Sequence, residues 1–443
     1  MNFNNRNLHH AILSMILVLS LVATIVAQTG ATGSQAVAVP KVEFEKYTLP
    51  NGLQVILHVD RKLPVVHVNQ WFHVGSKNEK TNRTGFAHLF EHMMFQGSQN
   101  AKGEYFSYVE RAGANLFTGG VNGTTNNDRT NYFATVPSGN LEFLLWLESD
   151  RLLTLPEALT KEKLDNQRDV VKNERRQSYD NVPYGRAFET ILAAVFPPGH
   201  PYSWPTIGSM TDLSAASLED VKQFFRTYYA PNNATLAIAG DFNRDSVKVW
   251  VQRFFAEIPR GPEMPPRPAT REVTVPKDTF LVLEDKVQLP RLYYAWPSAK
   301  AFHADDASLD LLSYVLAGDK NSRLYKRLVY EMQVAQDVSA FQISGRLDGM
   351  FGVTVTPKPG QSPARMAQLV NEELRKLAAQ GISERELARA QNTYRAQFLD
   401  QLASVNGKAD QLNFYDYFAG TPDYVRQDAA RYTAVTAADV QRV

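Results

Sequence analysis

The 443-residue sequence contains no cysteine. Disulfide bonds and thiolate metal ligands are therefore excluded, so any metal site in this chain must use His, Asp or Glu side chains. The charge balance is also nearly even, with 47 Lys and Arg residues against 46 Asp and Glu residues. Because no long basic run is present either, we expect no nucleic-acid partner.

Long apolar runs are scarce, and the clearest one lies close to the N-terminus. Residues 11–27 are apolar apart from Ser14, Ser20 and Thr24, and a polar stretch follows them. This pattern is typical of a secretory signal peptide cleaved after Ala27, and a retained single-span anchor is the alternative. We expect an exported protein, periplasmic or secreted, with no stable membrane span if the signal is cleaved.

An amphipathic helix is predicted between Gly85 and Gly97. Its apolar residues recur at the spacing of one buried helix face, and they are Phe86, Leu89, Phe90, Met93 and Met94. Asn82 or Thr84 can cap the start of this helix, and Gly97 can end it.

Three ionisable residues interrupt that apolar pattern. His88 and His92 are four positions apart, so both imidazoles can reach one cation. Glu91 lies next to His92, where its carboxylate can hold a water on that cation. The order His-x-x-Glu-His reverses the His-Glu-x-x-His of common zinc proteases. Ordinary polar residues at a helix edge are the alternative, but unpaired ionisable groups in apolar surroundings cost several kcal/mol.

A carboxylate that can complete the site lies further along the chain. Leu164, Gln167, Val171 and Glu174 fall on one face of a predicted helix, and catalytic zinc usually takes three protein ligands. Glu174 is therefore the candidate third ligand. The alternative is a solvated residue in the charged run 172–176.

These motifs resemble the inverzincin metallopeptidases, the insulinase/pitrilysin (M16) family that includes mitochondrial processing peptidase. The resemblance begins at Gly75-Ser76 and 85–97 and covers nearly all the chain after residue 42, densely in its first half. It continues through 119–122, 130–132, 150–151, 171–174, 200–202, 207–208, 229–236 and 240–241.

The resemblance implies a zinc-dependent peptidase with one Zn²⁺ per chain. His88, His92 and Glu174 would be its ligands, and Glu91 would be the general base for a water that attacks a peptide carbonyl. Glu91 as a fourth ligand is the alternative, but adjacent helix residues point about 100° apart.

Other positions match the family less closely. Gln167 stands where active relatives commonly carry a Glu that supports the ligands from behind. Asn122 and Gly120 match the edge of the substrate cleft, where an extended peptide can add as a strand, and a plain surface turn is the alternative. The family's Arg/Tyr pair that grips substrate falls on Val329 and Gln336, and neither matches.

The second half of the chain repeats the first. Residues 53–57 have a counterpart in 280–283, and residues 132–137 have one in 351–357. Their common order indicates a duplication. In this register His88 corresponds to Asp310, His92 to Tyr314 and Glu174 to about Gln397, so the second copy lacks the ligands.

We therefore predict an α+β protein of two tandem homologous units, each a mainly antiparallel sheet with helices packed on one face. The second unit is expected to be incomplete at its C-terminus. The predicted parts are a signal peptide (1–27), a flexible linker (28–41), a catalytic zinc-binding M16 domain (42–258), a Pro-rich linker (259–272) and an inactive M16-like domain (273–443).

The predicted function is a zinc metalloendopeptidase acting on peptides or unfolded polypeptides. The alternative is a non-catalytic or partner-dependent accessory subunit of such a peptidase. A second M16-type chain, or a missing C-terminal half, is the expected partner that would supply the Arg/Tyr pair.

Overall fold

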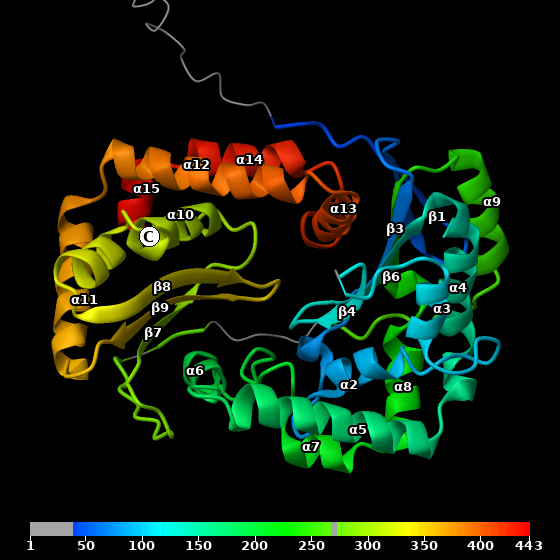
Figure 1. Ribbon diagram of the computed structural model, residues 1–443, viewed down its shortest axis with the longest axis horizontal. Helices are drawn as coiled ribbons and strands as arrows, with labels where there is room; N and C mark the ends of the chain where they lie inside the picture. The colour runs from blue at the N-terminus through cyan, green and yellow to red at the C-terminus, as the bar shows by residue number, and fades with distance from the viewer. Residues whose placement is uncertain (1–38, 118, 267–272, 276) are drawn as a thin grey trace, which may run out of the picture. The chain divides into compact units, whose positions relative to one another are not determined.

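The computed structural model describes residues 39–117, 119–266, 273–275 and 277–443 (Figure 1). Of these, Lys41–Val443 form one compact unit. The predicted signal peptide, most of the first linker and residues 267–272 of the Pro-rich linker lie outside the described residues. Within the described residues, no helix is both long and apolar enough to cross a bilayer.

The first half is built on a six-stranded sheet with the order β1-β2-β6-β3-β5-β4. Its strands are β1 (Glu45–Thr48), β2 (Gln54–Val59), β3 (Val65–Phe72), β4 (Val121–Thr125), β5 (Thr130–Pro137) and β6 (Ala234–Gly240). Only the pair β2–β6 is parallel. β4 is the last strand in this order, so among the described residues its edge away from β5 is free of a neighbouring strand.

Helices α2 and α4 pack directly on this sheet, and α5 and α8 pack on α2. The helices of the first half are α2 (Phe86–Met93), α3 (Tyr105–Arg111), α4 (Leu141–Ala158), α5 (Lys161–Arg175, extended by a π-helical turn over Arg176–Asp180), α6 (Ala187–Val195), α7 (Met210–Ala215), α8 (Leu218–Tyr228) and α9 (Arg244–Phe255). Phe72 of β3 and Phe90 of α2 both pack against the Tyr229 ring, at centroid distances of 4.4 and 4.2 Å. These buried aromatic contacts fix α2 against the sheet.

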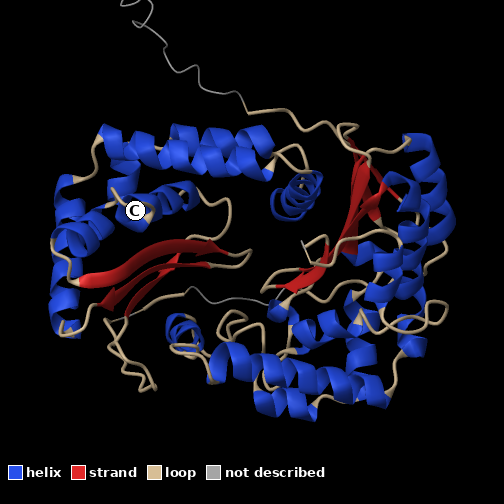
Figure 2. Cartoon of the chain, viewed as in Figure 1, coloured by secondary structure: helices blue, strands red, loops and turns tan. Residues whose placement is uncertain are grey.

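The second half repeats this plan with a three-stranded antiparallel sheet, β7-β9-β8 (Figure 2). Its strands are β7 (Leu292–Ser298), β8 (Ala335–Ser344) and β9 (Gly349–Pro357), and its helices are α10 (Asp306–Ala317), α11 (Pro363–Gln380), α12 (Glu384–Gln401), α13 (Val405–Ala419), α14 (Val425–Ala434) and α15 (Ala437–Arg442). The order β7-β9-β8 matches β3-β5-β4 of the first sheet. The prediction of two tandem α+β units is confirmed.

Each sheet also receives a helix from the other half on its second face. α13 packs on β3 and β6, where Asn413 donates from Nδ2 to the Asn69 carbonyl at 3.0 Å. Tyr417 of the same helix stacks on His73 at 4.4 Å. Conversely, Leu192 of α6 joins an apolar cluster with Met350 of β9. This exchange of helices was not predicted from the sequence.

One strand expected in the second half from the sequence repeat is not formed. Residues 280–283, the expected counterpart of β2, form no strand, and Phe280 is 90% exposed. In the first half β2 pairs with β6. No strand of the described second half occupies the position of β6, so residues 280–283 have no neighbour with which to pair.

Candidate metal centre

The start of α2 is held by a carboxylate from outside the helix. Glu79 accepts hydrogen bonds from the backbone N–H groups of Gly85 and Ala87, at 3.1 and 2.8 Å. Trp204 Nε1 donates to the same carboxylate at 3.0 Å. Because a helix N-terminus carries unpaired N–H groups and partial positive charge, this arrangement stabilises α2. Burial nevertheless raises the pKa of Glu79 to about 8.

The predicted caps Asn82 and Thr84 are wrong, because the capping position is Gly85 and no side chain at that position caps the helix. Thr84 instead donates from its hydroxyl to Asp212 at 2.6 Å. Gly85 has φ 86°, a left-handed conformation that favours glycine. A Cβ there would also lie 2.8 Å from the Ile207 carbonyl oxygen.

The structure brings together the three residues predicted as ligands. Glu174 Oε2 lies 3.3 Å from His92 Nε2 and 3.6 Å from His88 Nε2. α2 supplies both imidazoles, and α5, which packs against α2, supplies the carboxylate. Among the residues that the structure describes, this is the one group of three His, Asp or Glu residues placed to hold an ion.

The geometry of this group fits zinc. Two ligands at about 2.0–2.1 Å from a tetrahedral ion lie about 3.3–3.4 Å apart, close to the distances from Glu174 to the two imidazoles. Glu174 Oε2 is buried without a hydrogen-bond partner, which is costly for a carboxylate unless a cation meets it. Two nitrogens and one oxygen are also a common ligand set for catalytic zinc.

Burial and neighbouring charges set the protonation of the group. Burial, with the His92 charge, lowers the pKa of His88 to about 4, which keeps that imidazole neutral and able to bind a metal. Burial also lowers the pKa of His92, but Glu174 and Glu91 outweigh it and the net pKa is raised. Interaction with the His92 imidazole lowers the pKa of Glu174.

Glu91 lies beside this group and faces strand β4. Its side chain is largely buried, and Thr125 Oγ1 donates to its Oε2 at 2.6 Å. Burial raises the pKa of Glu91, and the Thr125 hydrogen bond partly opposes that rise. A Cβ at Gly123 would lie 3.0 Å from Glu91 Cγ and from the Phe95 ring. Glycine is thus what lets β4 pass close beneath this carboxylate.

Sequence reasoning missed both Thr125 and Gly123. Their only signal is their place in the strand that the resemblance assigns to the substrate cleft, and the contact with Glu91 depends on how β4 packs on α2.

The remaining predicted residues lie around the same site. Gln167 is buried on α5, and its side-chain amide lies close enough to the His92 imidazole to raise the pKa of His92. Asn122 is exposed on the edge strand β4. Gly120 immediately precedes β4, and its N–H donates to the Asn115 carbonyl at 3.1 Å. The structure therefore gathers Gln167 behind the candidate ligands and places the other two along a free strand edge.

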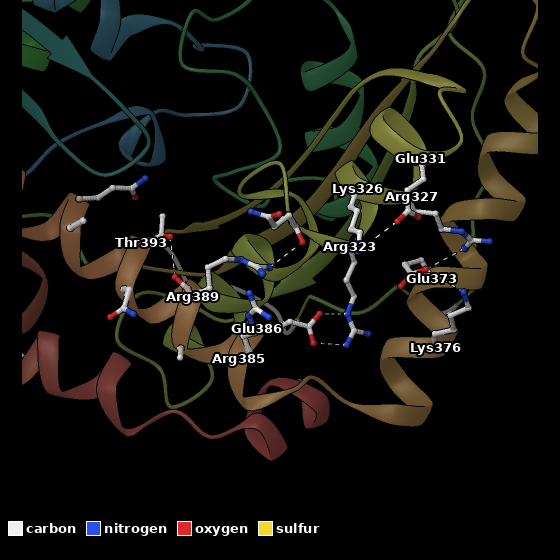
Figure 3. Close-up of a pocket in the computed structure, with 15 residues that line it drawn as sticks. Arg323, Lys326, Arg327, Glu331, Glu373, Lys376, Arg385, Glu386, Arg389 and Thr393 are labelled. Atoms are coloured by element: carbon white, nitrogen blue, oxygen red, sulfur yellow. Dashed lines mark hydrogen bonds and ion pairs between the residues drawn. The ribbon is translucent and has the colours of Figure 1, made fainter. Parts of the chain in front are cut away.

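The arginines near the expected Arg/Tyr position are engaged elsewhere (Figure 3). They line a groove of about 1180 Å³ in the second half. Arg323 forms a bidentate pair with Glu386, at 2.7 and 2.9 Å. Arg327 pairs with Glu372 at 2.6 Å and with Glu373 at 3.2 Å. Neither guanidinium is free to grip a substrate without breaking these pairs.

Comparisons with known proteins agree with the two-unit fold. Residues 54–201 match the family model described as insulinase (peptidase family M16), and residues 215–394 match the model described as peptidase M16 inactive domain. A protein of Helicobacter pylori named zinc protease PqqE is 31% identical over 429 residues, covering 94% of this chain and 91% of that protein. The chain belongs to the insulinase (peptidase M16) family.

Solved structures share the fold. The crystal structure of a protease from Helicobacter pylori superimposes with a TM-score of 0.83 at 27% identity, covering 91% of this chain and 96% of that one. The first half of the periplasmic protease PqqL from Escherichia coli gives a TM-score of 0.69 at 20% identity, covering 91% and 89%. The second likeness bears on the fold alone.

Proposed function

We propose that this chain is a zinc-dependent metalloendopeptidase, in which His88, His92 and Glu174 hold one Zn²⁺ and Glu91 acts as general base. The observation that carries the proposal is the convergence of the three candidate ligands beside a largely buried carboxylate and a free strand edge. When bound, zinc would lower the pKa of a water and polarise the scissile carbonyl.

The protein's own groups would supply the rest of the reaction. Glu91 would accept the proton of the attacking water and later deliver it to the leaving amine. Burial raises the pKa of Glu91, which makes its carboxylate a stronger base toward the attacking water. The Thr125 hydroxyl would hold the carboxylate in place. Gln167 would orient His92 from behind as a neutral group.

An extended polypeptide is the substrate that the site would accept. The free edge of β4 offers unpaired backbone groups next to the ligands, so a peptide could add there as a further strand. Such binding depends on hydrogen bonds to the main chain of the peptide more than on contacts with its side chains. We therefore propose peptides or unfolded polypeptides as substrates, with Asn122 and Gly120 bordering the bound strand.

The second candidate function is that of a partner-dependent subunit. It is favoured by Val329 and Gln336 at the positions of the family's Arg/Tyr pair, and by the engagement of Arg323 and Arg327 in ion pairs. In this version the chain carries the metal, and another M16-type chain supplies the substrate grip. We also propose export to the periplasm or beyond, on the apolar run at 11–27.

Peptide cleavage and zinc content test the two candidates together. Wild type should contain about one zinc per chain and cleave an unfolded protein in a chelator-sensitive way. Glu91→Gln should keep zinc and lose at least about a hundredfold in kcat. Glu110→Gln, an exposed carboxylate on α3, is the matched control and should match wild type. A zinc-loaded chain that cleaves only after a second family member is added would favour the subunit. A chain that binds no zinc would contradict both.

A further inference from the structure

A buried carboxylate lies in the turn that joins β4 to β5. Asp128 is 4% exposed, and Tyr202 Oη donates to both of its oxygens at 2.8 and 2.9 Å. The backbone N–H of Arg346 donates to Oδ2 at 3.0 Å, and Lys77 Nζ lies 3.4 Å from Oδ1. Asp128 is therefore held by several donors at once, which fixes its position more firmly than a single hydrogen bond would.

These contacts join the two halves of the chain. Arg346 lies in the turn between β8 and β9, and the N–H of Leu347 in that turn donates to Tyr202 Oη at 3.0 Å. A Cβ at Gly345 would lie only 2.5 Å from the same Oη, so this turn approaches Tyr202 as closely as glycine allows. The β4–β5 turn and its counterpart in the second half thus meet at Asp128.

The β4–β5 turn itself is short and internally hydrogen-bonded. Asn126 Oδ1 accepts from the N–H groups of Asp128 and Arg129, at 2.8 and 2.9 Å. The Asn126 carbonyl accepts from the Ser76 N–H at 3.1 Å. A displacement of Asp128 would therefore be transmitted to the end of β4 rather than absorbed by the turn.

The end of β4 touches the proposed general base. Thr125, three residues before Asp128, donates from Oγ1 to Glu91 Oε2 at 2.6 Å. Gly123 packs beneath the Glu91 side chain. The position of Glu91 relative to the candidate ligands thus depends on the position of β4.

We propose that the second half, which lacks the metal ligands, positions Glu91 through Asp128, with Tyr202 and Thr125 as the links on either side. Asp128, Tyr202 and Thr125 are positioning residues, because they act through Glu91 and not on substrate. This inference rests on the proposed function for its kinetic consequence, but the positioning itself is a property of the fold.

A control variant is needed to distinguish positioning of Glu91 from a contact that only holds the two halves together. Asp60 and Lys408 provide it, because they form another largely buried ion pair across the halves, and Asp60 lies in the loop after β2 rather than beside β4. Asp128→Asn and Asp60→Asn each remove one negative charge with almost no change in shape. If these pairs only hold the halves together, the two variants should behave alike.

Hydrogen exchange of the zinc-loaded chain is the first measurement, since it needs no activity. In Asp128→Asn and in Tyr202→Phe, those amides of β4 that donate to β5 should lose protection by about tenfold or more. In Asp60→Asn they should match wild type. Equal protection of β4 in Asp128→Asn, Asp60→Asn and wild type would overturn the proposal, whether or not the chain is a peptidase.

Peptide cleavage by the same variants is the second measurement. A displaced general base should lower kcat by about tenfold to a hundredfold in Asp128→Asn and Thr125→Val, with KM within about twofold and zinc content unchanged. Thr125→Ser, which keeps the hydroxyl, should restore most of the rate. The double variant Asp128→Asn/Thr125→Val should lose less than the product of the single losses. The positioning proposal would be contradicted if the two single losses in kcat multiplied fully in the double variant, or if Asp60→Asn lost as much activity as Asp128→Asn. If wild type failed to cleave any peptide, the proposed function would be contradicted. The hydrogen-exchange result would then decide the positioning proposal.

Discussion

The two halves of the chain place different side chains at the same three positions of a shared fold. In the first half His88, His92 and Glu174 converge with an unpartnered carboxylate oxygen. In the second half Tyr314 and Gln397, the counterparts of His92 and Glu174, are hydrogen-bonded directly to each other.

The residue at the third position of the second half also has a hydrogen-bond partner within the protein. Asp310, the counterpart of His88, accepts a hydrogen bond from Tyr432 Oη, and burial raises its pKa to about 7. In the second copy, hydrogen bonds therefore join α10 to α12 through Tyr314 and Gln397, and α10 to α14 through Asp310 and Tyr432. The first copy leaves polar atoms without partners, and this is what distinguishes a candidate metal site from a structural contact.

Substitution of a candidate ligand should have the largest effect on the difference between the two halves. His92→Ala should lower zinc content from about one per chain to nearly none, because two remaining ligands bind zinc weakly. Cleavage should fall to the background. Tyr314→Ala, at the same position of the second half, should leave zinc content unchanged. Metal analysis of the dialysed proteins measures both, and zinc loss in Tyr314→Ala would show that the two positions are not distinct in the way described.

A methyl group added beneath Glu91, the proposed general base, should have the next largest effect. Gly123→Ala would place Cβ 3.0 Å from Glu91 Cγ and the Phe95 ring, so β4 or Glu91 must shift. We expect kcat to fall by about tenfold to a hundredfold with zinc retained. Gly139→Ala is the control, since no atom lies within 4 Å of the new Cβ. Steady-state kinetics that found both variants equal to wild type would refute this packing.

A negative charge at position 167 should strengthen zinc binding at the candidate site. The Gln167 amide lies beside the His92 imidazole and raises its pKa, and Gln167→Glu would add a negative charge there. We expect zinc affinity to rise by about tenfold, the lower end of what such supporting residues contribute. Gln397→Glu adds the same charge on α12 and should not change affinity at the first site. Competition with a chelator of known affinity measures this, and weaker binding in Gln167→Glu would count against the assigned position.

The smallest expected effect concerns the ion pairs of the second half. The Arg323 guanidinium lowers the pKa of Glu386 from its ordinary 4.5 to about 2. Because the folded pKa is depressed, the stabilisation is present above pH 4.5 and is lost as the pH falls toward 2. The pair is partly exposed, so we expect Glu386→Gln to cost about 1 kcal/mol at pH 7. The difference from wild type in urea unfolding should shrink as the pH is lowered from 4.5, and a constant difference would contradict the pair's role.

Much of the first half could be predicted because its signals are local. The spacing of His88, Glu91 and His92 on an apolar helix and the buried face that leads to Glu174 are both helical patterns. The strands β2 and β6 are largely apolar, and β3 and β5 are rich in β-branched and aromatic residues. The duplication was readable because the same order of strands and helices recurs.

What could not be predicted depends on contacts between distant segments. Glu79 caps α2 in place of Asn82 or Thr84 because the chain before the helix folds back onto its N-terminus. Thr125 meets Glu91 only because β4 packs on α2. Helices α6 and α13 each pack on the sheet of the other half, and residues 280–283 find no strand with which to pair. Both features depend on contacts between the two sheets and distant segments, and the periodicity of apolar residues carries no information about such contacts.

The location of zinc in crystals of the wild-type chain tests the account most directly. Anomalous scattering at the zinc edge should show one peak per chain, within bonding distance of His88 Nε2, His92 Nε2 and a Glu174 oxygen, about 2.0–2.2 Å. No peak should lie between Asp310, Tyr314 and Gln397. A peak in the second half, or a zinc bound in the first half without Glu174, would contradict the account.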